Sequence, residues 1–238
     1  MVLSSAGCNY MTGLVGNITI PVYNGGNVGW AGEIESASDG AGTFSEVTLE
    51  PKRITAYIDI SKQFLIQDSV SAEALIRADI VRAISCKLEE TILGAEAGST
   101  KQPKGIFNGA TTIADTSYET MVGLVQKLEE ANVSGDFKYI VSPAIKAKLK
   151  TTKKDNGSGL FVMEGNEVDG IPVLSTTSCK GLVLGNFEDY VIAQWGAIDL
   201  TIDPYTQAAN GKVRLVVNAY FDAKPRRTEA FIAKTLGE

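Results

Sequence analysis

A long amphipathic helix constrains the fold of this chain more than any other feature of its sequence. An isoleucine or leucine recurs every four residues along it, at Ile76, Ile80, Ile84, Leu88 and Ile92. This spacing places the apolar side chains on one helix face and predicts a helix over residues 71–95, ended by Gly94 and Gly98. At about 1.5 Å per residue, the helix is about 37 Å long. That is longer than a compact domain of this size usually requires, so the length limits the possible folds.

The segment before this helix is typical of β-structure. Residues 17–23 form a short strand, and residues 28–35 and 44–50 flank a turn-rich tip at 36–43, which predicts a β-hairpin. The hairpin carries few large apolar side chains, and a long two-stranded arm is marginally stable alone in water. We therefore expect a second copy of the chain to supply its partner surface. A mobile surface hairpin is the alternative.

The remaining pattern mixes helices with strands. We expect helices at 118–131 and from Pro143 to Leu149, and an exposed basic loop at 151–159. Strands are expected at residues 54–61, 137–141, 171–174, 181–185, 190–193, 197–202, 213–219 and 230–235. The order predicts an α+β protein with at least two lobes and an arm.

Composition excludes several classes of function. The chain contains no histidine, which removes Ser-His and Cys-His nucleophile pairs and His-ligated metals. Its three cysteines, Cys8, Cys86 and Cys179, are widely spaced, which predicts unpaired structural thiols in a reducing compartment. The formal charge of −6 argues against a duplex-binding surface. No apolar run has the length of a membrane helix, so no membrane partner is expected.

Paired carboxylates are the remaining candidates for acid–base chemistry. The three pairs are Glu33 with Glu35, Glu89 with Glu90, and Glu188 with Asp189. We expect all of them to be solvated, in turns or on the polar side of a helix. The glycine-rich stretches at 25–29 and 39–42 lack the lysine and hydroxyl residue of a phosphate loop, and no segment has calcium-loop spacing. The sequence therefore predicts no catalytic residue, no cofactor and no metal site, and we expect no enzyme.

Taken in order, short motifs along the chain resemble the major capsid proteins of tailed bacteriophages, whose Hong-Kong-97-type fold is shared with encapsulin shells. The motifs lie at residues 14–17, 20–22, 30–33, 58–63, 102–106, 141–143, 154–159, 170–173 and 184–190. None is specific alone, but their common order covers most of the chain. The resemblance implies a structural shell subunit with an extended hairpin arm, a peripheral domain and an axial domain.

The resemblance also implies a domain division and partners. It places a lead-in segment at 1–23, the arm at 24–60, the peripheral domain at 61–112 with 197–238, and the axial domain at 113–196. Copies of the chain would form the pentamers and hexamers of an icosahedral shell around DNA, without sequence-specific binding. Portal, scaffold or protease proteins are further expected partners during assembly. The shell would be made in the bacterial host cytoplasm and located in the virion.

Two features depart from the family pattern. The lead-in strand begins about 17 residues from Met1, whereas family members usually carry a longer N-terminal arm, so we expect a matured or truncated form. Some members crosslink a lysine on the arm to an asparagine of a neighbour. Residues 28–50 contain no lysine. Although Asn210 lies in a plausible acceptor region, we expect no such crosslink.

Two surface segments are the expected contacts between subunits. One is the hairpin tip and the other is the basic loop, with the residues Ser38, Asp39, Gly40, Ala41, Gly42, Lys153, Lys154, Asp155 and Asn156. Two other functions remain open at this point. An encapsulin-type nanocompartment would load a protein cargo, and neighbouring terminase and portal genes would distinguish it from a phage shell. A carbohydrate-active or carbohydrate-binding module would need two carboxylates about 5 to 10 Å apart in a concave pocket.

Overall fold

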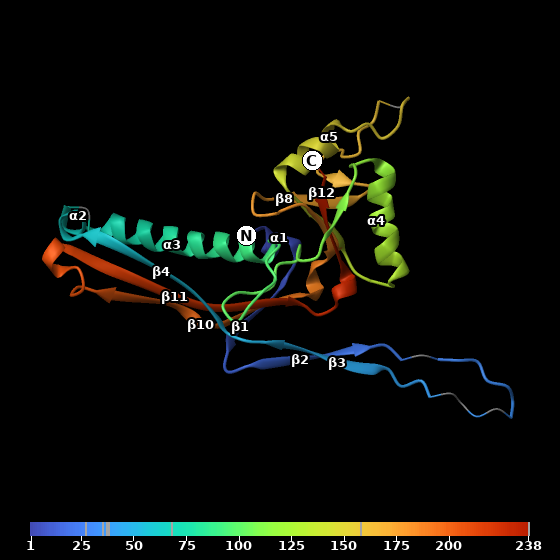
Figure 1. Cartoon of the computed structure of the whole chain (residues 1–238), viewed down its shortest axis with the longest axis horizontal. Coiled ribbons are helices and arrows are strands. Elements are labelled where there is room, and N and C mark those ends of the chain that lie inside the picture. Colours follow the sequence, from blue (N-terminus) through green and yellow to red (C-terminus); the bar gives the residue numbers. More distant parts are fainter. Residues whose placement is uncertain (27, 35, 37–38, 68, 158, 238) are drawn as a thin grey trace.

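The fold is an elongated body with a lobe at one end and a projecting hairpin (Figure 1). It comes from a computed structural model that describes residues 1–26, 28–34, 36, 39–67, 69–157 and 159–237. The α-helices are α1 (Val2–Ala6), α2 (Lys62–Gln67), α3 (Ser69–Ile92), α4 (Tyr118–Glu130) and α5 (Pro143–Thr151). Short 3-10 helices lie at Phe187–Asp189, Ala208–Asn210 and Thr228–Ala230. None of the helices in the described ranges is both long and apolar enough to cross a bilayer.

The long helix α3 confirms the helix that the apolar pattern predicted. It begins two residues before the expected start and ends three residues before the expected end. Helices α4 and α5 begin at side-chain caps, where Ser117 Oγ accepts from Thr120 N–H and Ser142 Oγ accepts from Ile145 N–H. Pro143 occupies the first turn of α5, where its missing N–H costs nothing.

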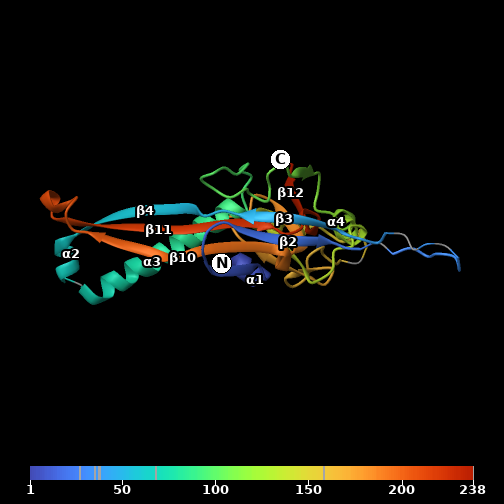
Figure 2. The ribbon, with the colours of Figure 1, turned by 90° about the horizontal axis from the view of Figure 1, so that it is seen from below.

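A four-stranded sheet lies along α3 and forms the elongated body. Its strand order is β1 (Asn9–Leu14), β10 (Tyr190–Asp203), β11 (Lys212–Pro225), β4 (Lys52–Ser61). The helix stripe packs on this sheet in one buried cluster that includes Ile84, Leu88, Val217 and Phe221. Figure 2 shows the strands and α3 running along the same long body. Burial of this stripe supplies the stabilisation that an isolated helix lacks.

Strand β10 is continuous where two strands were expected. The break anticipated after Ala193 is an irregularity in register between Trp195 and Asp199, and Gly196 there has φ of 64°. Glycine adopts this left-handed backbone without strain. The strand therefore bends at Gly196 and continues to pair with β11.

A six-stranded sheet forms the lobe. Its order is β5 (Thr111–Ile113), β12 (Phe231–Leu236), β9 (Leu182–Asn186), β6 (Phe137–Val141), β8 (Ile171–Ser175), β7 (Glu167–Val168). Alternate residues face opposite sides. Tyr139 and Leu184 pack with α4 and α5, whereas Ile140 and Val183 join the cluster under α3.

The hairpin consists of different strands from those expected. Strand β2 (Ile18–Asn24) pairs with β3 (Thr43–Leu49), from Ile18 opposite Leu49 to Asn24 opposite Thr43. The expectation that residues 28–35 form the partner strand is wrong, because the described residues of that range contain no strand. Gly29 and Gly32 weaken a strand in that range, whereas β2 carries Ile18, Ile20 and Val22 in alternation without a glycine between them.

The N-terminal helix α1 corrects the expectation for Glu89. That carboxylate was expected to be solvated, but its residue is only 7% exposed and its Oε1 accepts from Leu3 N–H at 3.1 Å. Helix α1 covers it, because Leu3 and Ala6 are buried in the same cluster as α3. The orphan N–H groups of a helix start are a suitable partner for a buried carboxylate. Glu90, in contrast, is exposed and pairs with Lys87.

Sheet membership places two segments beside elements distant in sequence. Strand β4, in the range expected for the arm, pairs with β11 along its whole length. Strand β12, in the range expected for the peripheral domain, pairs with β9 and β5 in the lobe. The division into arm, peripheral and axial domains stays a prediction.

Candidate functional site

The hairpin formed by β2 and β3, with the segment between them, projects away from both sheets (Figure 1). We call residues 18–49 the arm. Its outer part carries large apolar side chains in solvent: Val28, Trp30 and Ile34 are 96%, 107% and 99% exposed. The Tyr23 and Phe44 rings pack against each other, tilted by 44° with 4.9 Å between ring centroids, and are also exposed. Apolar groups gathered in this way indicate a surface that another molecule covers.

The arm is also strongly acidic. Residues 24–51 contain five carboxylates and neither lysine nor arginine. Glu33, Asp39 and Glu46 are among these carboxylates and are exposed. A partner for the arm therefore needs apolar contacts and positive charge on the same surface.

The base of the arm is held by a small apolar cluster. Leu49 is fully buried against Val191, Ala193 and Trp195 of β10. The indole Nε1 of Trp195 donates to the carbonyl of Gly16 at 2.6 Å, just before β2 begins. These contacts fix where the arm leaves the sheet.

A buried carboxylate joins the arm to β11 at the same place. Asp222 is completely buried, and its Oδ2 accepts from Lys52 Nζ at 2.8 Å and from Glu50 N–H at 3.0 Å. Its Oδ1 accepts from Ala223 N–H. Neither Asp222 nor Lys52 was singled out in the sequence, because no local spacing connects residues so far apart. A lone Asp inside the apolar strand 213–223 was the only available signal.

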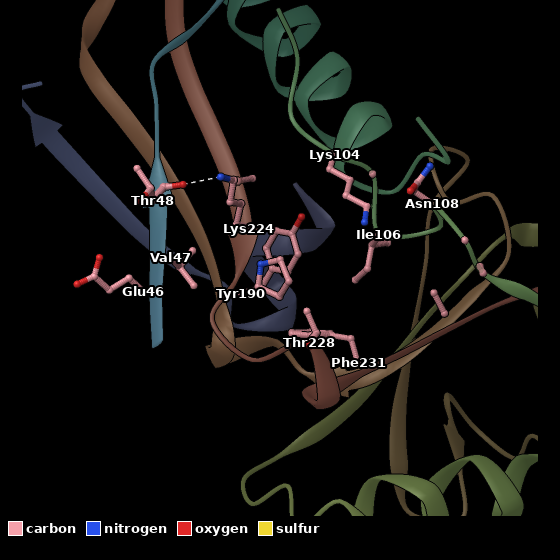
Figure 3. Close-up of a pocket in the computed structure, with 16 residues that line it drawn as sticks. Glu46, Val47, Thr48, Lys104, Ile106, Asn108, Tyr190, Lys224, Thr228 and Phe231 are labelled. Carbon is pink, nitrogen blue, oxygen red and sulfur yellow. Dashed lines mark hydrogen bonds between the residues drawn. The ribbon is translucent and has the colours of Figure 1, made fainter. Parts of the chain in front are cut away.

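A groove of about 510 Å³ lies beside the arm base (Figure 3). The Lys224 side chain lines part of it, and its Nζ donates to the Thr48 carbonyl. Tyr190 and Phe231 form an apolar wall, with their rings edge to face at 5.6 Å between centroids. The groove is lined by Glu46, Val47, Thr48, Lys104, Gly105, Ile106, Asn108, Gly109, Ala110, Tyr190, Ala223, Lys224, Pro225, Thr228, Phe231 and Ala233. Glu46 is the only carboxylate in this lining, so the groove does not hold a pair for acid–base chemistry.

The predicted tip residues do not lie at the far end of the arm, because Gly40 and Gly42 lie against the backbone of Gly26 and Gly25, next to the ends of β3 and β2. Asp39 Oδ1 accepts from Ala41 N–H at 3.0 Å, and Gly42 N–H donates to the Tyr23 hydroxyl at 3.3 Å. Gly40 lies between them, and Ser38 lies outside the described residues. This backbone is thus held by the Asp39 carboxylate and by the Tyr23 hydroxyl of β2.

The predicted basic loop lies at the end of α5, on the other side of the lobe from the arm (Figure 1). Lys153, Lys154, Asp155 and Asn156 are all exposed. Lys154 Nζ lies 4.1 Å from the centre of the Tyr118 ring, and Asp155 Oδ1 accepts from Gly157 N–H. Within one chain, the fold does not bring the tip and the basic loop together.

The titratable groups with shifted pKa values stabilise the fold and lie in no common cleft. Burial raises the pKa of the Cys8 thiol to about 12 and that of Cys179 to about 11. Hydrogen bonds from Arg214 lower the pKa of Asp59. All three cysteines are free, with Cys8 and Cys179 buried and Cys86 exposed. Across the described residues, no cluster of three or more metal-ligating side chains is present.

Comparison with solved structures shows the fold. The capsid of a native GTA particle superposes with a TM-score of 0.76 at 15% identity, over 96% of this chain and 87% of that one. A chain from Microbacterium phage Oxtober96 gives 0.79 at 12% identity, over 98% and 90%. A chain from Mycobacterium phage Adephagia gives 0.77 at 13% identity, over 99% and 90%. The chain has the α+β, Hong-Kong-97-type capsid fold.

Comparison with sequences shows the family. The "Major capsid protein" of Halomonas phage phiHAP-1 is 28% identical over 239 residues, which cover 97% of this chain and 40% of the relative. The chain thus spans less than half of that relative's length. The model of the Phage capsid family matches residues 5–235. The chain belongs to the Phage capsid family.

Proposed function

We propose that the chain is a major capsid protein, a structural subunit that assembles with copies of itself into an icosahedral shell. The shell encloses the DNA genome of a tailed phage or prophage. Membership of the Phage capsid family and the printed name of the Halomonas phage relative support this function.

The arm is the observation that carries the proposal. A chain acting alone gains nothing from Val28, Trp30 and Ile34 in water, since exposed apolar groups favour association. In a shell, the arm lies on a neighbouring copy, which covers these side chains. The tip residues Asp39 to Gly42 and the basic loop 153–156 are the proposed contacts between subunits.

The remaining partners and the location follow from this role. Copies form pentamers and hexamers, and portal, scaffold and protease proteins act during assembly. A chain with a charge of −6 encloses DNA without binding a sequence, because tight phosphate binding requires a basic surface. The protein is made in the host cytoplasm and ends in the virion.

The structure disfavours the carbohydrate-directed alternative. Three cavities, beside the arm base, α3 and α4, are each lined by a single carboxylate, Glu46, Glu90 or Glu130. Hydrolysis or protonation of a sugar needs a facing pair. We therefore propose a structural and non-enzymatic role.

Replacement of the outer arm tests the function. Because Asn24 lies opposite Thr43, residues 25–42 can be replaced by a two-residue Asn-Gly turn that closes the hairpin. We expect the unaltered chain to form shell-sized particles in light scattering and negative-stain microscopy. The shortened variant should remain folded by circular dichroism but fail to form particles.

A milder variant for comparison is Trp30→Ala, which removes only one exposed ring. It should raise the protein concentration needed for assembly without changing the melting temperature. Monomers of the unaltered chain at every concentration would overturn the proposed function. Normal particles from the shortened variant would remove the arm from the assembly mechanism.

A further inference from the structure

The N-terminal helix α1 lies at the joint between the elongated body and the lobe. In Figure 1, it sits beside the end of α3, where the lobe begins. Leu3 and Ala6 are its buried residues, and both belong to the cluster in which α3 meets Ile140 of β6 and Val183 of β9. Helix α1 therefore packs against both parts of the molecule.

Two side chains of opposite charge hold the two ends of α1, and we call them the clamps. At the start, Oε1 of Glu89 on α3 accepts from the Leu3 N–H at 3.1 Å. At the end, Nζ of Lys138 on β6 donates to the carbonyls of Ser5 at 3.3 Å and Ala6 at 3.0 Å. Each charge suits the helix end that it faces, because free N–H groups lie at the start of a helix and free carbonyls at its end. The body thus supplies one clamp and the lobe supplies the other.

The clamps differ from the buried ion pair at the arm base. Helix α1 covers Glu89, and Lys138 is half-buried, so both charges can return to water when α1 leaves. Asp222 is completely buried between the arm base and β11, and it can reach water only if the sheet opens. An open α1 therefore leaves no buried charge without a partner, which removes the main cost of opening.

A glycine provides the pivot for such a movement. Gly7 has φ of 97°, and its N–H donates to the Ser4 carbonyl at the end of α1. Two residues later, Asn9 pairs with Val191, where β1 joins the sheet. The five residues of α1 are too few for a stable helix in water, so the segment gains conformational freedom when it opens. It can leave while β1 stays in place.

We infer that α1 is a latch on the joint between body and lobe. Closed, it stiffens this joint. It opens by local unfolding of residues 1–7, while both sheets stay folded. The inference goes beyond the proposed function, because the latch belongs to a single copy and acts whether or not copies assemble.

The buried thiols report the opening of the latch. Cys8 directly follows the pivot, and its N–H donates to the Leu3 carbonyl within α1. Cys179 is buried too, but it lies in the lobe, where its thiol donates to the Ile140 and Gly181 carbonyls. With the exposed Cys86 replaced by serine, alkylation by iodoacetamide can be followed at each buried thiol by mass spectrometry.

The urea dependence of alkylation separates local opening from global unfolding. Without urea, we expect Cys8 to react about tenfold faster than Cys179 or more, because local opening requires less free energy than global unfolding. The rate at Cys8 should hardly change with urea below the unfolding transition, since opening α1 exposes little surface. The rate at Cys179 should rise with urea in parallel with global unfolding followed by circular dichroism.

Removal of either clamp should favour the open state. Glu89→Ala leaves the Leu3 N–H without its acceptor, and Lys138→Ala leaves two carbonyls without their donor. Each should raise the alkylation rate of Cys8 about tenfold, because these hydrogen bonds involve a charged group. Gly7→Ala retains both clamps but strains the left-handed backbone, and it should raise the same rate by a similar factor.

Two substitutions at exposed charges nearby serve as matched controls. Glu90→Ala removes the carboxylate next to the first clamp on α3, and Lys127→Ala removes an ammonium of α4 in the lobe. Both should leave the alkylation rate of Cys8 unchanged. Circular dichroism confirms that each variant is folded before alkylation.

A distance measurement tests the stiffening of the joint. Nitroxide labels on the native Cys86 of α3 and on Gln126→Cys of α4 report the body and the lobe, in a chain with Cys8 and Cys179 replaced by alanine. Pulsed electron paramagnetic resonance should give a narrow distance distribution while both clamps are present. The distribution should broaden when both clamps are replaced by alanine.

Three results would overturn the latch. A Cys8 rate with the same urea dependence as Cys179 would show that α1 opens only with the whole fold. A Cys8 rate unchanged by both clamp substitutions would show that the charges do not hold α1, and an unchanged distance distribution would show that α1 does not stiffen the joint. Failure of the unaltered chain to form particles would overturn the proposed function and leave the latch intact.

Discussion

At the residue scale, Asp222 determines how the arm is attached. A fully buried carboxylate is strongly unfavourable unless it is paired and hydrogen-bonded. Here the ammonium of Lys52 and two backbone N–H groups satisfy it, one of them from Glu50, directly after the arm. The pair fixes the direction of the chain where the arm returns to β4.

We therefore expect Asp222→Ala to destabilise the chain by about 3 kcal/mol or more, because it leaves the buried Lys52 ammonium and the Glu50 N–H without an acceptor. Urea denaturation followed by circular dichroism measures this change. The matched control is Asp79→Ala in the exposed Asp79–Arg82 pair, which should change the free energy of unfolding by less than about 1 kcal/mol. Equal effects of the two substitutions would show that Asp222 has no special role.

The sequence could not predict this residue pair. Local pattern identifies which segments form strands, and it correctly predicted a strand at residues 213–219, within β11. It contains no information on which distant strand supplies the partner of a buried charge. Glu89 illustrates the same limit, since its acceptor role depends on α1, which lies 86 residues away along the chain.

At the element scale, the sequence predicts correctly the elements that depend on contacts between residues close in the chain, and it fails where distant residues pair. Helices α3, α4 and α5 depend on contacts within a few residues, and their expected positions agree with the structure within about three residues. The hairpin partner was wrong because strand pairing is set by register across the sheet, which local alternation does not encode. The basic loop was predicted correctly as exposed, but the link that Asn186 makes between Ser134 and Glu188 was not found, because only the fold brings these residues together.

A charged substitution should destabilise the chain strongly in helix α3 and hardly at all in the arm. Ile84 is 7% exposed within the main cluster, so Ile84→Asp buries an unpaired carboxylate and should destabilise the chain by about 4 kcal/mol or more. Asp39→Lys changes an exposed tip side chain that bonds only within the tip, and should shift stability by less than about 0.5 kcal/mol. Thermal melting compares them. A lower melting temperature for Asp39→Lys than for Ile84→Asp would contradict the assignment of α3 to the core.

At the scale of the whole molecule, the absence of histidine leaves no side chain with an ordinary pKa between those of the carboxylates and the thiols. The groups with shifted pKa values titrate either at low pH or at high pH. Asp59, Asp115, Asp203 and Glu90 have lowered pKa values, chiefly through hydrogen bonds to the carboxylates. The Cys8 and Cys179 thiols have pKa values raised by burial.

These directions predict a broad plateau in stability against pH. A lowered carboxyl pKa contributes stability above the ordinary value near 3.8, and this contribution is lost as the pH falls. A thiol pKa raised from 9.0 to about 12 contributes stability below pH 9.0, and this contribution is lost as the pH rises. The free energy of unfolding should therefore stay nearly constant between about pH 6 and 8 and decrease on both sides.

The alkaline side of the plateau tests the contribution of the Cys8 thiol to the free energy of unfolding. Between about pH 9 and 11, the folded chain keeps the Cys8 proton that the unfolded chain releases, so this thiol alone lowers the free energy of unfolding by about 1 kcal/mol per pH unit. Cys8→Ala should remove that part of the slope while leaving the acid side unchanged. Denaturant titrations at each pH measure both limbs. A decrease in stability between pH 6 and 8, or an alkaline slope unchanged by Cys8→Ala, would contradict the assignment of a buried protonated thiol to the core beneath α3.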